Sequence, residues 1–439
     1  MRHVSCATII AICCLSFRLP CHASPPGSPL GPTKMIRLGK LVDGTGKVQS
    51  DALIVVEGDR IVRMGEGDVA VPENAERIDL SRYTGIPGLI DVHTHMTFYW
   101  DQAAGTRPWQ QWSERMQAMT VFLAQENARK TLETGVTTVR DLGSWDYSDI
   151  AMRDLIQRGA MSGPRMFVSG WGLHATLEKV KPGDTSLDPG RADGVPEVLR
   201  VVRQQVAAGA DVIKMYGSTG SGHDLTGNQT FTFEEMKAAV DAAHQAGKRI
   251  AIHSYGSAGA RDAVRAGADS VEHATDLDDE TLSEMARRKT FYVPTIDHNR
   301  YYAEYREQYG YSQDDADHLT AYIQRNLETA RRAHNAGVRF AMGSDAVFTM
   351  FGQNTRELGW FVKAGMTPAE ALAAATTNGA ALLGKEKELG AIAPGYYADI
   401  VAVEGNPLED IQTVIQGVRW VMKGGVVVVD KTKTDPGKP

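Results

Sequence analysis

The chain has 439 residues, of which 42% are hydrophobic and 23% are charged, and this composition indicates a globular protein with a sizeable core. The 54 Asp and Glu outnumber the 47 Lys and Arg, which gives a formal net charge of -7. A mildly acidic chain without a basic run lacks the electrostatic footprint of a nucleic-acid-binding protein. At roughly 150 residues per domain, the length allows two or three domains, or one large barrel with an appendage.

The first 23 residues have the layout of a secretory signal peptide. A short basic start precedes an apolar stretch, and small residues flank the predicted cleavage site after Ala23. We therefore predict a secreted or periplasmic protein that leaves the membrane after cleavage. The alternative, a lipoprotein anchor at Cys21, is disfavoured by Pro20 and Arg18. Residues 24–34, rich in Pro and Gly, are expected to form a flexible lead-in.

All four cysteines lie inside this predicted signal peptide, so the mature chain would contain none. That excludes disulfides, a cysteine nucleophile and thiolate metal sites. Any metal ion would have to be held by His, carboxylate or other oxygen ligands.

Both ends of the remaining chain have the pattern of short β-strands. In residues 35–84, two apolar runs are separated by the turn sequence Glu57-Gly58-Asp59, which predicts a hairpin. Strand-like runs return in residues 386–430, before a C-terminal tail at 431–439. We expect the two ends to pair into one small β-sandwich domain.

The middle of the chain, residues 85–385, alternates short β-branched runs with amphipathic helical stretches. The strand-like runs are 86–95, 137–142, 165–169, 212–216, 249–253, 270–273, 291–295 and 339–344. Eight strand–helix units predict an α/β fold of the (β/α)8 TIM-barrel class. A doubly wound open sheet is the alternative; a glycine-rich phosphate turn after the first strand would favour it, and the sequence has none there.

Candidate metal ligands stand at the ends of several of these strands. His93 and His95 are two residues apart, so both imidazoles face the same side of the first barrel strand and can chelate one ion. Four other strand ends carry Lys214, His253, His273 and Asp345. A buried core histidine, a helix-capping Asp or an ion-paired Lys would explain any one of them. Their joint occurrence at the carboxyl ends of the strands, where barrel enzymes place catalytic groups, favours an active site.

With these motifs in this order, the sequence resembles the amidohydrolase superfamily of metal-dependent hydrolases over nearly the whole mature chain. The segment Gly135–Asp141 and the closing Ala398–Val401 are similar to the branch that contains imidazolonepropionase and Xaa-Pro dipeptidases. Bacterial amidohydrolases that split ochratoxin belong to the same branch.

The resemblance implies two divalent metal ions bridged by an N6-carboxylated Lys214. His93, His95 and Asp345 would hold the first ion, and His253 and His273 the second. These ligands suit Zn2+, with Mn2+, Co2+ or Fe2+ as substitutes. A water shared by two such ions loses its proton near neutral pH, and Asp345 would be the catalytic base. A mononuclear site is the alternative, and it would leave Lys214 without a role.

Residues at the strand ends or just past them are candidates for substrate binding. They are His174, Tyr216, His223, Tyr255, His298 and Arg140. Donors of this kind suit a small-molecule or dipeptide-like substrate whose departing portion carries a free carboxylate.

We therefore expect an exported binuclear hydrolase, a homo-oligomer, that cleaves an amide next to a free carboxylate in dipeptides, N-acyl amino acids or aryl amides. A cyclic-amide hydrolase or deaminase is one alternative. A non-catalytic assembly protein on the same scaffold is another, which the complete set of ligand positions disfavours.

Overall fold

The computed structural model describes residues 33–66, 72–176 and 188–433. The predicted signal peptide, most of the lead-in and the end of the tail lie outside the described residues. No helix among the described residues is both long enough and apolar enough to cross a membrane.

Two parallel sheets lie at the centre of the α/β part of the chain. A three-stranded sheet has the order β5-β6-β7, and a five-stranded sheet has the order β12-β11-β10-β9-β8. The strands are β5 (Leu89–Thr94), β6 (Val136–Asp141), β7 (Arg165–Val168), β8 (Val212–Tyr216), β9 (Arg249–Ser254), β10 (Ser270–His273), β11 (Phe291–Val293) and β12 (Arg339–Phe340). Each predicted strand-like run contains one of them, and the carboxyl ends of neighbouring strands lie together.

Backbone hydrogen bonds join the two sheets at both of their edges. Between β7 and β8, Leu173 pairs with Met215 in a parallel bridge. At the other seam Thr94 pairs with Ala346, and the Val92 amide donates to the Met342 carbonyl at 2.8 Å. The two sheets are therefore neighbours on both sides, which is the connectivity that a barrel requires.

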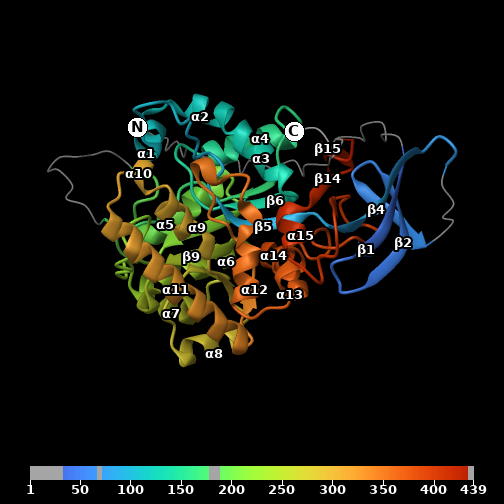
Figure 1. Ribbon diagram of the computed structural model, residues 1–439. Coiled ribbons are helices and arrows are strands. Elements are labelled where there is room, and N and C mark those ends of the chain that lie inside the picture. The colour runs from blue at the N-terminus through green and yellow to red at the C-terminus, as the bar shows by residue number, and fades with distance from the viewer. Residues whose placement is uncertain (1–32, 67–71, 177–187, 434–439) are drawn as a thin grey trace, which may run out of the picture.

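Helices surround these strands (Figure 1). The helices are α1 (Pro108–Glu114), α2 (Gln117–Leu123), α3 (Gln125–Glu133), α4 (Ser148–Gln157), α5 (Val195–Ala208), α6 (Phe233–Gln245), α7 (Ser257–Ala266), α8 (Asp279–Arg288), α9 (Ile296–Glu304), α10 (Arg306–Tyr309), α11 (Gln313–Asn335), α12 (Glu357–Lys363), α13 (Pro368–Ala374), α14 (Thr377–Leu383) and α15 (Gln412–Gln416), with 3-10 turns η1 (Phe348–Met350) and η2 (Asn354–Arg356). Several of them end at a glycine: Gly209 and Gly267 adopt φ of 100° after α5 and α7, a left-handed stop that glycine tolerates.

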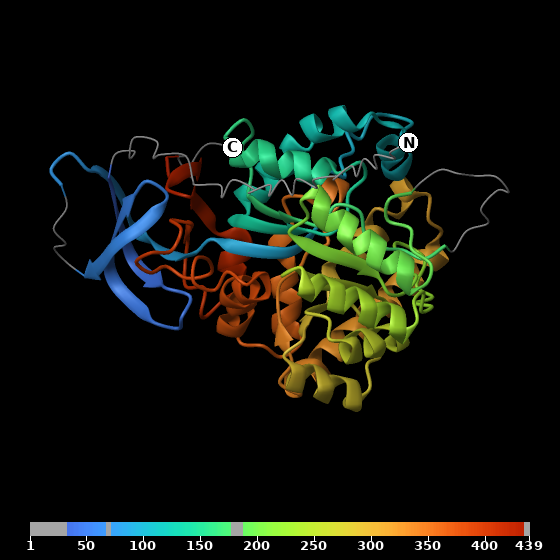
Figure 2. The same ribbon diagram turned by 180° about the vertical axis from the view of Figure 1, so that it is seen from behind.

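A seven-stranded sheet at one end of the molecule contains both ends of the described chain (Figures 1 and 2). Its order is β15-β14-β13-β4-β1-β2-β3. The strands are β1 (Lys34–Val42), β2 (Val48–Glu57), β3 (Arg60–Glu66), β4 (Glu76–Pro87), β13 (Ile400–Val403), β14 (Val418–Lys423) and β15 (Val426–Asp430). The antiparallel pairing of β4 with β13 joins the two ends. The described strands form one continuous sheet, so the two-sheet sandwich stays a prediction.

Two expected elements are divided in the structure. The run 86–95 splits at Gly88, so β4 ends in the seven-stranded sheet and β5 begins the parallel one. A Cβ at Gly88 would lie 2.2 Å from Thr137 Oγ1, which shows how tightly the chain passes between the two sheets. One of the expected helical stretches, between the first two parallel strands, is divided into α2 and α3, which meet at Ala124.

Candidate metal and active site

Six predicted ligands meet at the carboxyl ends of the parallel strands. His93 and His95 end the first strand, Lys214 lies in β8, and Asp345 follows β12. His253 and His273 complete the set from β9 and β10. All six side chains are buried, and they line a cavity of about 680 Å³. The sequence prediction that these residues share one site is therefore consistent with their placement.

The Asp345 carboxylate is the centre of this cluster. Its Oδ1 lies 3.2 Å from His95 Nε2 and 3.6 Å from His93 Nε2. Its Oδ2 lies 3.2 Å from His298 Nε2 and 4.0 Å from His273 Nδ1. Four imidazoles thus surround one buried carboxylate.

Second partners fix how several of the imidazoles present their nitrogens. His93 Nδ1 lies 2.8 Å from Glu272 Oε2, and His95 Nδ1 lies 3.1 Å from the Gly143 carbonyl. Both oxygens accept, so each Nδ1 carries the proton. The Nε2 lone pairs of both rings are then directed at the cavity.

This arrangement fits a bound cation. Asp345 Oδ1 lies 3.2 Å from His95 Nε2, and although burial lowers the pKa of His95, this hydrogen bond and the charge of Asp345 outweigh burial and raise it. A divalent cation would replace the shared proton between these two atoms and make both of them ligands. One ligand atom each from His93, His273 and Asp345 lie within 4.8 Å of one another. The nitrogen and oxygen donors, without sulfur, suit the divalent ions predicted from the sequence.

Burial keeps three of the imidazoles, those of His93, His253 and His273, neutral and therefore able to ligate. It lowers the pKa of His93 to about 4, with help from the charge of Lys214. The pKa values of His253 and His273 are held well below their usual range by burial, Lys214 and neighbouring imidazoles. Burial also lowers the pKa of Lys214, to about 8, although Glu272 and Asp345 oppose the shift. Lys214 Nζ lies 3.4 Å from His93 Nε2, inside the ligand set.

Asp345 is ionised at neutral pH despite its burial. Burial raises its pKa, but the charges and hydrogen bonds of His298, His93 and His95 outweigh that effect and hold the pKa well below its usual range. A buried, ionised carboxylate facing a cavity has the charge state that a base or a metal ligand needs.

Arg140, predicted to contact the substrate, lies below the site instead. Its guanidinium donates to Glu272 Oε1 at 2.9 Å, to the Val92 carbonyl at 2.5 Å and to Ser270 Oγ at 3.0 Å. Only 1% of Arg140 is exposed, and it does not line the cavity. The reason is its position within β6, where it points into the interior and neutralises Glu272. Arg140 is thus a positioning residue for His93: it donates to Glu272, and Glu272 accepts from His93 Nδ1.

Among the other predicted substrate contacts, His174, Tyr216, Tyr255 and His298 line the cavity. His174 lies at its rim, where Nε2 contacts Asp188 at 2.8 Å and Nδ1 contacts the Gly172 carbonyl at 3.1 Å. His298 is buried against Asp345. His223 is exposed and packs on Tyr311, 4.7 Å between ring centroids, outside the cavity, because the loop after β8 carries it outward.

Sequence reasoning missed two residues that orient metal ligands. Glu272 precedes His273 in β10, and alternation in a strand would point them to opposite sides. His273 has a φ of 72°, so the strand ends in a left-handed turn, and both side chains contact His93. Thr295 follows β11 with a φ of 48°, and its hydroxyl lies 2.6 Å from His273 Nδ1. An acidic residue next to a strand-end histidine is the signal that could have found Glu272, whereas Thr295 follows another strand and has no such signal.

It also missed an aromatic wall of the cavity. Phe98 stacks on the His95 ring at 4.8 Å, and Trp112 lies 4.1 Å from Phe98. Trp109 and Trp145 continue this wall. These residues come from segments after the first two parallel strands, which carry no periodic pattern that would reveal a shared surface.

Strand-end imidazoles and a buried carboxylate in a deep cavity, on an α/β scaffold, define the class of metal-dependent hydrolases. The amidohydrolase family pattern matches residues 84–428, and the chain belongs to this family. Both the family and the enzymatic nature predicted from the sequence are confirmed.

Individual relatives support the same assignment. The chain is 30% identical over 426 residues to ochratoxinase from Aspergillus niger, covering 89% of this chain and 85% of that protein. It is 26% identical over 460 residues to imidazolonepropionase from Geobacillus kaustophilus, covering 94% and 96%. The crystal structure of a Xaa-Pro dipeptidase with bound methionine in the active site is similar, with a TM-score of 0.80, 33% identity and coverage of 90% of this chain and 99% of that one.

Proposed function

We propose that this protein is an exported, binuclear metal-dependent amidohydrolase that cleaves an amide bond next to a free carboxylate. The observation that carries the proposal is the Asp345 carboxylate surrounded by four imidazoles, beside Lys214, in a cavity of about 680 Å³. The substrates we propose are dipeptides and N-acyl or aryl-amide amino acids, including phenylalanine amides of the ochratoxin type.

Two divalent cations held by His93, His95, His253, His273, Asp345 and a carboxylated Lys214 would supply Lewis-acid activation of the carbonyl and an ionised water. Asp345 takes the proton of the attacking water and passes it to the departing amine. His298, 3.2 Å from Asp345 Oδ2, holds that carboxylate in place while the proton moves. The aromatic wall, Phe98 and Trp112 among its members, excludes bulk water and strengthens these interactions.

Lys214 is proposed to act as a carbamate. As an ammonium it would face the imidazole of His93 at 3.4 Å and repel any cation bound beside it. Addition of carbon dioxide to the neutral amine, with loss of one proton, converts it into an anionic oxygen ligand. Glu272 and Arg140 neutralise each other below it, so the local charge is left to Lys214 and Asp345.

The free carboxylate of the substrate is the part of this proposal that the relatives support. A Xaa-Pro dipeptidase cleaves, by its name, a dipeptide that ends in a free carboxylate, and this chain is 33% identical to one. Tyr216 and Tyr255 line the cavity and could donate to such a group.

One observation favours the second candidate, a cyclic-amide hydrolase like the imidazolonepropionase relative. Among the described residues that line the cavity, Lys214 is the only Lys or Arg, so a carboxylate would meet no fixed cation outside the metal ligands. Rates for one good substrate as free acid and as C-terminal amide decide between the two. A free acid turned over at least about tenfold faster supports the first function. Equal rates would favour the cyclic-amide hydrolase.

Three further proposals concern the whole molecule. Seam hydrogen bonds such as Val92 to Met342 support a closed (β/α)8 barrel. The signal-peptide pattern supports export, which N-terminal sequencing of secreted material near Ser24 would test. Exposed apolar side chains in and beside α2, among them Met116 and Phe122 at 72% and 70% exposure, support a homo-oligomer. Light scattering in solution measures the oligomeric state.

A further inference from the structure

Helix α9 carries His298 and begins without a side-chain cap of its own. Its N-cap residue is Thr295, whose φ is 48° and whose hydroxyl makes no capping hydrogen bond. That hydroxyl lies 2.6 Å from His273 Nδ1, so it is used on a candidate metal ligand. The first backbone N–H groups of a helix have no acceptor within the helix, and burial without one costs stability. Another residue must therefore supply the acceptors for α9.

Glu357, the first residue of α12, supplies both acceptors. Its Oε1 accepts from the Ile296 amide and its Oε2 accepts from the Asp297 amide, each at 2.9 Å. Glu357 is fully buried. Trp360, one turn later in α12, donates from its Nε1 to Asp297 Oδ1 at 2.9 Å. Two oxygens on two successive amides, together with this third bond, fix the first turn of α9 in both position and rotation.

His298 depends on this helix end more than the other imidazoles around Asp345 do. The Nδ1 atoms of His93, His95 and His273 each face an oxygen of a second partner. His298 Nε2 lies 3.2 Å from Asp345 Oδ2, but its Nδ1 is buried without a hydrogen-bond partner among the described residues. With no second polar partner, the direction of the His298 ring is set by packing and by the backbone that carries it.

Helix α13 shows how a helix end is capped locally. The Thr367 hydroxyl accepts from the Glu370 amide, and the Glu370 carboxylate accepts from the Thr367 amide, so two residues of one turn satisfy the helix end. At α9 the local hydroxyl contacts His273 instead, and a residue of α12 replaces it. The replacement places a carboxylate in the interior, a desolvation cost that a local cap avoids. The cap of α9 is therefore arranged to suit the site and not the helix alone.

We propose that Glu357 is a positioning residue, which holds His298 against Asp345 by capping α9 from a neighbouring helix. The inference rests on the proposed amide-hydrolase function, in which Asp345 takes and returns the proton of the attacking water. His298 holds that carboxylate in place during the transfer. Glu357 is not among the residues that line the cavity, so it acts on the reaction through His298.

Glu357→Gln is the first test, because glutamine keeps the size of the side chain but turns an N–H group toward one of the two amides. With the zinc-loaded full chain and the best substrate among dipeptides and N-acetyl amino acids, we expect kcat to fall by about tenfold or more. KM should stay within about threefold, and about two zinc ions should still bind. Trp360→Phe removes the donor to Asp297 and should lower kcat in the same direction by a smaller factor.

Glu370→Gln is the matched control. Glu370 also supports a helix end, with its carboxylate 2.8 Å from the Thr367 amide, but it does not line the cavity. This variant should keep kcat within about twofold of the wild type. An equal loss of kcat in Glu370→Gln and Glu357→Gln would overturn the proposal, because capping of any helix would then have the same effect.

A double-mutant cycle separates positioning from a general loss of stability. In a His298→Ala background, Glu357→Gln should lower kcat by no more than about twofold, because the residue through which Glu357 acts is absent. The same large loss of kcat in both backgrounds would overturn the proposal, since Glu357 would then act on stability or through another residue. A Glu357→Gln protein with the kcat of the wild type would overturn it as well.

Two readouts need no turnover. Backbone hydrogen exchange at Ile296 and Asp297 should be at least about tenfold faster in Glu357→Gln than in the wild type, and unchanged in Glu370→Gln. A crystal structure of Glu357→Gln should show His298 Nε2 displaced from Asp345 Oδ2 by about 0.5 Å or more. Unchanged exchange and an unchanged distance would contradict the proposal whether or not the protein hydrolyses an amide. If His298 is displaced but the wild type hydrolyses no amide, the proposed function fails while the positioning of His298 by Glu357 stands.

Discussion

The seven-stranded sheet and the carboxyl ends of the parallel strands are both built from β-structure, yet they bury opposite kinds of side chain. The core of the sheet is a cluster of buried apolar residues, among them Ile36, Ile54 and Trp420. The strand ends bury Asp345, Glu272, Lys214 and five imidazoles within one cluster. Burying charged groups costs stability, whereas burying apolar groups stabilises the fold. The charged cluster at the strand ends therefore indicates a function and not a structural need.

The backbone shows the same contrast. His273, Thr295 and Asp345 adopt φ values of 72°, 48° and 53°, a left-handed region that residues with a Cβ avoid. In the seven-stranded sheet, Asp51 has a φ of 49°, but its side chain is half exposed and pairs with Arg37 on the surface. Strain at the strand ends is thus concentrated on residues that hold or orient metal ligands.

The largest effect should follow from Asp345→Asn. Asparagine keeps the shape of the side chain but cannot take a proton, so we expect kcat to fall by about 10³-fold or more while the fold is retained. Circular dichroism and metal analysis accompany the kinetics. Recovery of full activity in excess zinc would show that Asp345 acts only as a ligand.

Removal of the Lys214 side chain should lower the activity less than Asp345→Asn does. Lys214→Ala is expected to reduce metal content from about two ions per chain and to lower kcat/KM by about 10²-fold. Chelation of the wild type should abolish activity, and added Zn2+ should restore it. The carbamate proposal would be wrong if the variant kept two ions and full activity.

Glu272→Gln tests the buried pair below the ligands. The charges of Arg140 and His93 outweigh burial and lower the pKa of Glu272 to about 2, so it is ionised at neutral pH. The variant leaves Arg140 as an unpaired buried charge, which should cost about 3–5 kcal/mol of unfolding free energy. Glutamine offers one carbonyl oxygen where Arg140 and His93 Nδ1 each have a carboxylate oxygen, so the hydrogen bond that orients His93 weakens and metal affinity should fall.

The matched control for this variant is Glu284→Gln. Glu284 pairs with Arg287 and Arg288 on an exposed face of α8, where solvent screens the charges, so the change should leave the unfolding free energy close to that of the wild type. Equal losses of stability in the two variants would show that burial of the Glu272 pair has no special role.

A core variant in the seven-stranded sheet separates stability from function. Ile54 is fully buried, and Ile54→Ala should lower the unfolding free energy by about 2–5 kcal/mol. Because Ile54 lies in the sheet and not at the strand ends, kcat measured well below the melting temperature should stay within about twofold of the wild type. A large loss of kcat would show that the sheet and the site are coupled.

Sequence reasoning assigned the candidate ligands to one site because strand period and strand order are local properties. His93 and His95 are two residues apart on one strand, and Lys214, His253 and His273 end predicted strands. The family resemblance then linked residues that lie far apart in sequence. The carboxyl ends of parallel strands lie together, which is why the six candidate ligands reach one cavity.

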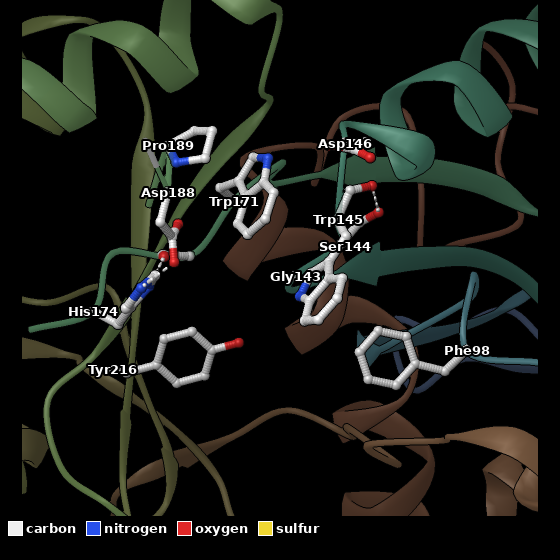
Figure 3. A pocket seen from close by; sticks show the side chains of 11 residues that line it. Phe98, Gly143, Ser144, Trp145, Asp146, Trp171, His174, Asp188, Pro189 and Tyr216 are labelled. Carbon is white, nitrogen blue, oxygen red and sulfur yellow. Dashed lines mark hydrogen bonds and ion pairs between the residues drawn. The ribbon is translucent and has the colours of Figure 1, made fainter. Parts of the chain in front are cut away.

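The residues that sequence reasoning misplaced depend on conformations without a pattern. Sequence reasoning placed Arg140 at the mouth of the cavity. Arg140 lies inside β6, however, where its position in the strand directs the side chain into the interior, and Glu272 compensates its charge there. Trp145 and Trp171 lie in loops after different strands and line one cavity (Figure 3), so they meet only in three dimensions. Left-handed residues such as Thr295 were equally hidden, because β-branched residues rarely adopt that conformation.

The smallest effect, and the sharpest test of the strain at the strand ends, concerns Thr295. Thr295→Gly should relieve about 1–2 kcal/mol of backbone strain but lose the hydroxyl that contacts His273 Nδ1, so unfolding free energy should change by less than about 1 kcal/mol while metal affinity falls. Thr295→Ser keeps the hydroxyl and should restore the affinity. Lys289, with a φ of 63° at the end of α8, is a strained residue away from the site, and Lys289→Gly should stabilise the protein by up to about 1 kcal/mol without changing metal affinity. Titration with Zn2+ and chemical denaturation measure both quantities. If Thr295→Gly gains as much stability as Lys289→Gly and binds metal as the wild type does, then Thr295 does not orient His273.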